Sequence, residues 1–161
     1  MKIEIKICGV SDNYSMSVIS NMNVDLVGLV FFEKSPRNIS IEKAKSLLKY
    51  LGNTTKVVAL TVNANDQFLS SIVTNLSPDY LQLHGEESPY RCFEIKKKFK
   101  TKIIKAISAK SSRNLNFEIH KYKFITDKII IDSPKDYLPG GNGKTFNWKF
   151  LKKEKKNFNW L

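Results

Sequence analysis

Two side chains suited to proton transfer stand near opposite ends of the chain, each directly after a short apolar run. Cys8 precedes Gly9, and Asp132 follows the run 129–131 and precedes Ser133. A thiolate can take a proton, and a carboxylic acid can give one. If the two runs are parallel strands of one sheet, their carboxyl ends gather on one face, where Cys8 and Asp132 become neighbours.

Each of these two residues also has a purely structural interpretation. A free cysteine is commonly a small buried hydrophobe, and Cys8 fits that role as well. A carboxylate at a strand end needs a partner if it is buried, but Asp132 also fits a residue that caps the turn at 133–134. Taken one at a time, the two residues leave both interpretations open.

Further polar candidates follow other expected strands. Arg37 lies in the polar loop 34–40, and its planar donor fork suits a carboxylate or a phosphate. Gln82 and His84 end another strand and share one of its faces, which points into the barrel mouth if Leu83 packs outward. The alternatives are a solvated loop arginine and a lone hydrogen-bonded histidine.

A glycine-rich segment follows the last complete strand. Its glycines, Gly140, Gly141 and Gly143, suit a backbone cradle for a phosphate or a mobile lid. The segment is not a Walker A loop, because its glycine spacing differs and it does not open a helix next to its strand. The alternative is a flexible surface loop.

Strands and helices are expected to alternate along the whole chain. Apolar runs predict strands that start near Ile3, Leu26, Lys56, Tyr80, Ile103 and Lys128, with an incomplete seventh near Asn157. Capping residues predict helices from Asp12 or Asn13 to about Met22, from Ser40 through 41–50, from Asp66 through 67–76, from Ser88 and Pro89 to Phe99, and after Asn147 through 148–155.

This alternation indicates βαβ units in the α/β class, with a parallel sheet. The runs 26–31 and 57–60 are apolar throughout, as expected for strands buried on both faces. An eight-unit barrel needs on the order of 200 residues. The 161 residues hold about six units and the start of strand seven, in one domain spanning 1–161. Either an open doubly wound sheet or an unfinished barrel fits, although the Rossmann glycine fingerprint is absent.

Composition narrows the function classes. Two cysteines and two scattered histidines provide neither a disulfide framework nor the spacing of a metal site. The net charge is +12, but the lysines fall mainly on expected helices and near the C-terminus without interleaved aromatic residues, so we expect no nucleic-acid partner. No apolar run reaches the length of a membrane span, and the N-terminus has no signal core. We therefore expect a cytoplasmic protein without membrane contact.

In their order on successive strand ends, these motifs resemble the phosphoribosylanthranilate isomerase family of tryptophan biosynthesis, whose fold is a (β/α)8 TIM barrel. The resemblance extends nearly from end to end, and its KSPR, QLHG and GGxGKTF elements are specific. The matching stretches are KICG at 6–9, GLVFFEKSPRNIS at 28–40, VNAN at 62–65, LQLHGEE at 81–87, IIKAIS at 103–108, IIIDS at 129–133 and GGNGKTFNW at 140–148.

The resemblance implies an Amadori rearrangement of a phosphorylated small-molecule substrate, N-(5′-phosphoribosyl)anthranilate, to 1-(o-carboxyphenylamino)-1-deoxyribulose 5-phosphate. It implies no metal and no organic cofactor. Asp132 would be the general acid that opens the ribose ring, and Cys8 the general base that takes the C2 proton. Arg37 would hold the anthranilate carboxylate. The remaining substrate contacts would come from Gln82, His84, Gly140, Gly141 and Gly143.

The chain departs from the family pattern in a few places. Asn142 replaces a threonine in the glycine loop, and Asn147 replaces an aspartate as a helix cap. The match ends within strand seven, so we expect the phosphate loops after strands seven and eight to be missing. We also expect an open, apolar barrel edge. A monomer, a homodimer or self-association through that edge fits this picture. The alternatives are a non-catalytic remnant of the same fold and an open flavodoxin-like sheet that binds a phosphorylated ligand.

Overall fold

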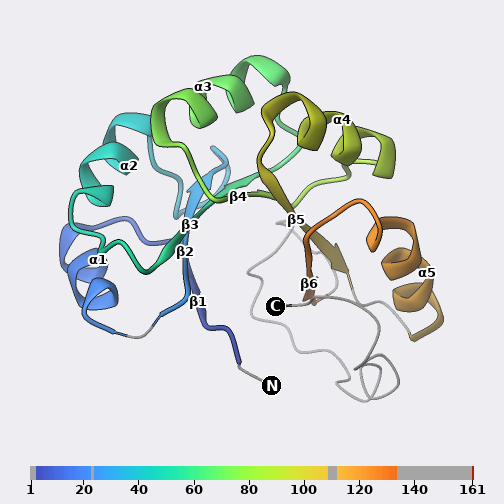
Figure 1. Cartoon of the computed structure of the whole chain (residues 1–161), viewed down its shortest axis with the longest axis horizontal. Coiled ribbons are helices and arrows are strands. Elements are labelled where there is room, and N and C mark those ends of the chain that lie inside the picture. Colours follow the sequence, from blue (N-terminus) through green and yellow to red (C-terminus); the bar gives the residue numbers. More distant parts are fainter. Residues whose placement is uncertain (1–2, 23, 109–111, 134–160) are drawn as a thin grey trace.

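In this computed structural model, the described residues are 3–22, 24–108, 112–133 and 161 of the 161-residue chain. They form parallel strands that alternate with helices (Figure 1). The strands are β1 Lys6–Cys8, β2 Leu26–Phe31, β3 Lys56–Thr61, β4 Tyr80–Leu83, β5 Lys102–Ser108 and β6 Lys128–Asp132. The helices are α1 Asn13–Ser20, α2 Ile41–Leu48, α3 Asp66–Leu76, α4 Pro89–Phe99 and α5 Ser112–Tyr122.

The strands follow one another across the sheet in chain order, from β1 to β6, and every neighbouring pair is parallel. Figure 1 shows the sheet curving, with the helices on its outer side. A flavodoxin-like sheet reverses its strand order at a switch point, so that alternative is wrong. The prediction of an α/β fold of the TIM-barrel class with six units is confirmed. That residues 1–161 form one domain stays a prediction.

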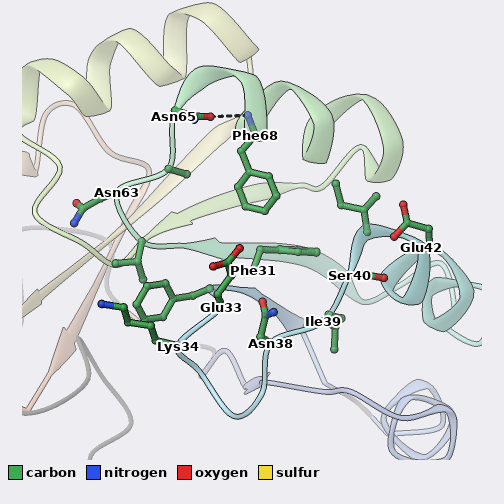
Figure 2. Close-up of a pocket in the computed structure, with 14 residues that line it drawn as sticks. Phe31, Glu33, Lys34, Asn38, Ile39, Ser40, Glu42, Asn63, Asn65 and Phe68 are labelled. Carbon is green, nitrogen blue, oxygen red and sulfur yellow. Dashed lines mark hydrogen bonds between the residues drawn. The ribbon is translucent and has the colours of Figure 1, made fainter.

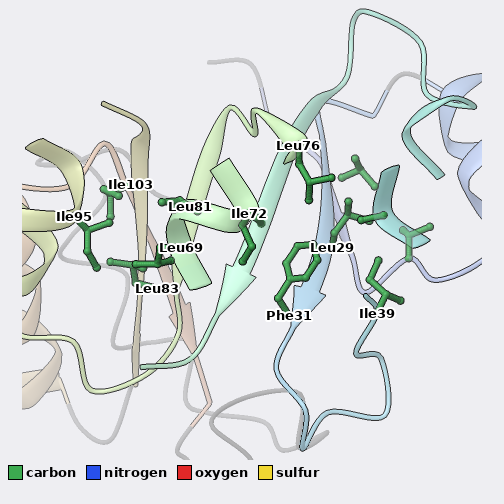
Figure 3. Close-up of a cluster of buried hydrophobic side chains, with 14 of the residues drawn as sticks. Leu29, Phe31, Ile39, Leu69, Ile72, Leu76, Leu81, Leu83, Ile95 and Ile103 are labelled. Carbon is green, nitrogen blue, oxygen red and sulfur yellow. The ribbon is translucent and has the colours of Figure 1, made fainter. Parts of the chain in front are cut away.

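The apolar strands are buried on both faces, as their sequences predict. On the inner face of the curved sheet, Leu26, Val58, Tyr80 and Ile104 form one cluster. The larger core lies between the outer face and the helices, where strand residues pack against helix residues (Figure 3). The residues labelled in Figure 3 include Leu29, Leu81, Ile103, Leu69, Ile72 and Ile95. Alternation of side chains along each strand thus separates an inner surface from the main core.

Most predicted helix starts are confirmed. Asp12, Ser40 and Ser88 are the N-caps of α1, α2 and α4, and each side chain accepts a hydrogen bond from a first-turn N–H. The predicted cap Asp66 is wrong. Asn65 caps α3 by accepting from the N–H of Phe68, so Asp66 is the first helical residue. Asparagine and aspartate both favour the N-cap position, so the sequence alone did not show which of Asn65 and Asp66 is the cap.

Other boundaries differ from the prediction. Helices α1 and α2 end at Ser20 and Leu48, before the expected Met22 and Tyr50, because their last carbonyls are used in tighter three-residue turns. The first strand starts at Lys6 instead of Ile3, and β5 starts one residue early. The predicted helix 148–155 and the start of strand seven lie outside the described residues, but Leu161 is described. Its N–H donates to the Ile129 carbonyl of β6 at 3.0 Å.

Helix α5 was not named by the sequence prediction. Its buried residues Leu115, Ile119 and Tyr122 recur at steps of four and three, which is the signal that could have found it. Within the described part of the chain, no helix is long and apolar enough to cross a membrane.

Strand β1 lies at one edge of the described sheet. Along it and just before it, Ile3, Ile5 and Ile7 expose 81%, 51% and 36% of their surface. The expected apolar edge is therefore present on this side of the fold. Self-association through it stays a prediction.

A buried ion pair ties together the carboxyl ends of the middle strands. The Lys105 ammonium lies 3.1 Å from a Glu87 carboxylate oxygen, and each side chain is only 3% exposed. Lys105 also donates to the carbonyls of Leu83 and Gly85, and Glu87 accepts from the Asn63 N–H. The pair thus connects β5 to the ends of β3 and β4.

Replacing Lys105 with Met should lower the free energy of unfolding by about 3–5 kcal/mol, because the Glu87 carboxylate stays buried without its partner. Urea unfolding followed by circular dichroism measures the loss. The double variant with Glu87→Gln should recover part of it. Lys121→Met is the matched control, because it breaks a surface pair with Glu118 and should change the midpoint little. Equal effects of the two lysine variants would contradict this account.

Candidate active site

The carboxyl ends of the strands bring several of the predicted residues onto the inner face. Cys8 ends β1, Asp132 ends β6, and Gln82 lies on β4 with His84 directly after it. The His84 N–H donates to the Thr61 carbonyl of β3 at 2.9 Å, which extends the parallel pairing by one residue. Because inward positions recur every second residue, Gln82 and His84 share the inner face. Their spacing predicted a shared face, and the packing of Leu83 in the outer core makes it the inner face, as expected.

Three of these side chains form a hydrogen-bonded row. The Gln82 amide nitrogen lies 3.0 Å from Nδ1 of His84, and Nε2 of His84 lies 3.2 Å from Oδ2 of Asp132. An amide N–H can only donate, so Nδ1 accepts and the ring proton is on Nε2. The imidazole therefore donates to the carboxylate. The row connects β4 to β6 across the inner face of the sheet.

Asp132 is held as a carboxylate by its neighbours. Its partial burial would raise its pKa, but the hydrogen bonds from His84 and from the Ser133 N–H, at 2.7 Å, outweigh burial and hold the pKa below the ordinary value of 3.8. The donation from Ser133 agrees with the expectation that Asp132 caps the turn at 133–134. The catalytic role of Asp132 stays a prediction.

The Gln82 side chain has one unused acceptor. Only 2% of the residue is exposed, and its Oε1 has no hydrogen-bond partner among the described residues. A buried carbonyl oxygen without a donor is costly. The Gln82 side chain thus keeps one buried acceptor unpaired within the described part of the chain.

The two cysteines have different environments. Cys92 is fully buried, and burial raises the pKa of its thiol to about 11, so it is unsuited to act as a base. Cys8 is only partly buried and lies on the inner face beside Gly28. It is the accessible thiol of the pair.

Arg37 lies directly above the end of β1. Its Nη1 is 3.5 Å from the Cys8 carbonyl oxygen, and a Cβ on Gly9 would lie 2.4 Å from its Cδ. Gly9 also has a φ of +87°, a conformation that side chains other than glycine rarely adopt. The turn after β1 thus makes room for an exposed guanidinium at the mouth, where its donor fork is available to a ligand.

The predicted phosphate glycines, Gly140, Gly141 and Gly143, lie outside the described residues. In the part of the chain that is described, no group of three or more His, Cys, Asp or Glu side chains could hold a metal ion.

The larger described cavity lies beside the row of catalytic candidates, not over it. It has a volume of about 580 Å³ and lies between the loops after β2 and β3 (Figure 2). Phe31 and Phe68 form apolar parts of its wall, and Asn38 and Asn63 add amides. None of Cys8, His84 and Asp132 lines it. The chemistry of the inner face, and not cavity size, therefore identifies the candidate site.

The fold is of the (β/α)8 type, and a thiol and a hydrogen-bonded carboxylate lie at the ends of its strands. The family model described as "N-(5'phosphoribosyl)anthranilate (PRA) isomerase" matches residues 5–160. N-(5'-phosphoribosyl)anthranilate isomerase of Chelativorans sp. (strain BNC1) is 36% identical over 94% of this chain and 70% of its own length. The protein of the same name from Parvibaculum lavamentivorans is 37% identical over 100% of this chain and 77% of its own. The chain therefore belongs to the phosphoribosylanthranilate isomerase family, as the sequence motifs predicted.

Solved structures agree with this assignment. The phosphoribosyl anthranilate isomerase of Thermotoga maritima matches with a TM-score of 0.83 and 28% identity, over 98% of this chain and 74% of that one. A second isomerase structure, with a TM-score of 0.80 and 26% identity over 99% of this chain and 74% of that one, holds reduced 1-(o-carboxyphenylamino)-1-deoxyribulose 5-phosphate.

The lowered pKa of Asp132 predicts a pH dependence of stability. A group whose pKa is lower in the folded than in the unfolded state stabilises the fold above its unfolded value, and this contribution is lost as the pH falls through the folded value. The free energy of unfolding should therefore fall as the pH drops below the ordinary value of 3.8. Asp132→Asn should fall less over the same range. Identical urea-unfolding curves against pH for the two proteins would contradict the assignment.

Proposed function

We propose that the chain catalyses the Amadori rearrangement of N-(5′-phosphoribosyl)anthranilate, with Asp132 as the general acid and Cys8 as the general base. The observation that carries the proposal is the placement of a hydrogen-bonded carboxylate and the accessible thiol at strand ends on the same inner face, in a chain of the isomerase family. The non-catalytic alternative is not favoured, because the chain keeps both groups.

The two groups act in sequence. Asp132 donates a proton to the furanose ring oxygen while the C1–O bond breaks and the anilino nitrogen lone pair forms a C1=N iminium. The iminium then makes the C2 proton acidic, and the Cys8 thiolate removes it to leave an enolamine. Protonation of the enolamine at C1 with loss of the hydroxyl proton gives the ketone. Each step is ordinary acid–base transfer by groups positioned for it.

Asp132 must be protonated when the substrate reacts. In the free protein 27% of its side chain is still exposed, and burial already works against the carboxylate. A substrate that covers the mouth strengthens this effect, and its own anionic groups disfavour a second negative charge nearby. Binding thus favours the protonated acid, and His84 supplies the hydrogen bond that orients it.

Arg37 and Gln82 fit the two ends of this substrate. The guanidinium at the mouth suits the anthranilate carboxylate, which can accept two parallel hydrogen bonds. Gln82, hydrogen-bonded to His84, would line the pocket on the ribose side. Contact of Gly140, Gly141 and Gly143 with the phosphate stays a prediction, as do the cytoplasmic location, the monomeric or dimeric state and the lack of a nucleic-acid partner.

The proposal predicts that Cys8→Ala and Asp132→Asn each lower kcat by at least about 100-fold, since general acid–base groups contribute 10²–10⁴-fold. The measurement is the loss of anthranilate fluorescence with substrate made in situ. Cys92→Ala is the matched control, because that thiol is buried and should leave kcat nearly unchanged. Full turnover in Cys8→Ala or Asp132→Asn would refute the assignment of that residue.

Arg37→Met should raise KM by about tenfold or more while kcat falls little, because a charge-assisted pair with the substrate carboxylate is lost. The sharper test is a substrate analogue made from aniline, which lacks the carboxylate. Wild type and Arg37→Met should have similar KM values for it. A preserved difference between the two proteins with the aniline analogue would show that Arg37 acts elsewhere.

A further inference from the structure

Lys6 reaches the space occupied by the Cys8 thiol. The two residues are separated by one position of β1, so their side chains leave the strand on the same face. The facing residue of β2 is Gly28, and a Cβ there would lie 2.6 Å from the Cys8 Sγ and 3.1 Å from the Lys6 Nζ. The missing side chain of Gly28 therefore leaves one space that thiol and ammonium share.

The Lys6 charge has no carboxylate partner within the described residues. Glu4 is two residues earlier, but it pairs with Lys128 of β6. Lys6 itself is partly buried, so water compensates its charge incompletely. A partly buried cation of this kind stabilises any anion that forms beside it.

We propose that Lys6 is a positioning residue that supplies the counter-charge for the Cys8 thiolate. This inference rests on the proposed role of Cys8 as the base. Among the described residues, the other charged or titratable groups toward this face are Arg37 on the loop above β1, Tyr80, His84 and Asp132 across the sheet, and the ion pair of Glu4 with Lys128. Since Arg37 binds the substrate carboxylate in the proposed mechanism and Lys128 pairs with Glu4, Lys6 is the described cation left for the thiolate.

In the proposed cycle, Lys6 acts through its positive charge alone. It stabilises the negative sulfur before the C2 proton is taken, and it is unpaired again once Cys8 holds that proton as a neutral thiol. Lys6 thus contributes to forming the base without exchanging a proton itself.

Alkylation of Cys8 by iodoacetamide tests this without any turnover, because the thiolate is the reacting species. Mass spectrometry of the Cys8 peptide gives the rate against pH. In Lys6→Met the rate at neutral pH should fall about tenfold, and Lys6→Arg should restore most of it. Lys56→Met is the matched control. Lys6 and Lys56 pair with the same β2 residue, Leu26, from opposite sides, but Lys56 is exposed and its loss should leave the rate unchanged.

Kinetics separate this role from substrate binding. Lys6→Met should lower kcat with little change in KM, and the activity should recover at higher pH, where the thiolate forms without help. A raised KM with unchanged alkylation would overturn the proposal, because Lys6 would then hold the substrate. Gly28→Ala is a second variant, since its Cβ displaces both groups and should slow alkylation as well. If Cys8→Ala were active, the proposed function would fail while the alkylation result on Lys6 would stand.

Discussion

The buried pair of Lys105 and Glu87 is the constraint on which the arrangement of the strand ends depends. Taking both charges out of water is expensive, and the cost is offset because both charged groups also form hydrogen bonds with the surrounding backbone. Lys105 donates to three backbone carbonyls besides Glu87, and the Glu87 carboxylate accepts from the N–H groups of Asn63 and Gly85. The Tyr122 hydroxyl of α5 adds a bond to the Glu87 carbonyl. The turn after β4 is therefore held from β3, β5 and α5 at once.

This support lies on the outer face of the sheet, whereas the chemistry lies on the inner face. Leu83 and Lys105 point outward, and Gln82 and His84, one residue from Leu83, point inward. Because the turn after β4 is held by contacts on the outer face of the sheet, His84 has few conformations. Its imidazole can therefore hold the Asp132 carboxylate at hydrogen-bond distance. Because side chains alternate between the two faces of a strand, one short segment contributes to the rigid core on its outer face and to the polar site on its inner face.

How much the sequence could predict depends on whether a signal was local. The starts of β2, β3, β4 and β6 and both ends of α4 were predicted to the residue, because apolar runs and caps are local signals. Alternation alone predicted that Gln82 and His84 share a face, and the outward packing of Leu83 makes it the inner one. The pairing of Lys105 with Glu87 could not be read in this way, because the partners come from different elements. A lysine inside the apolar run 103–107 was the one sign that a buried partner exists.

In the proposed mechanism, the acid Asp132 and the base Cys8 react in protonation states opposite to the ordinary ones. At neutral pH an ordinary aspartic acid has lost its proton and an ordinary cysteine has kept it. The reactive pair is a carboxylic acid and a thiolate. It holds one proton, as the ordinary pair does, but the proton is on the carboxyl group instead of the thiol. In the proposal, Lys6 puts positive charge beside the Cys8 thiol, while substrate burial acts at Asp132. The ionised Asp132 of the free protein is therefore compatible with a role as general acid. The influences on the two residues together favour the transfer of one proton from Cys8 to Asp132.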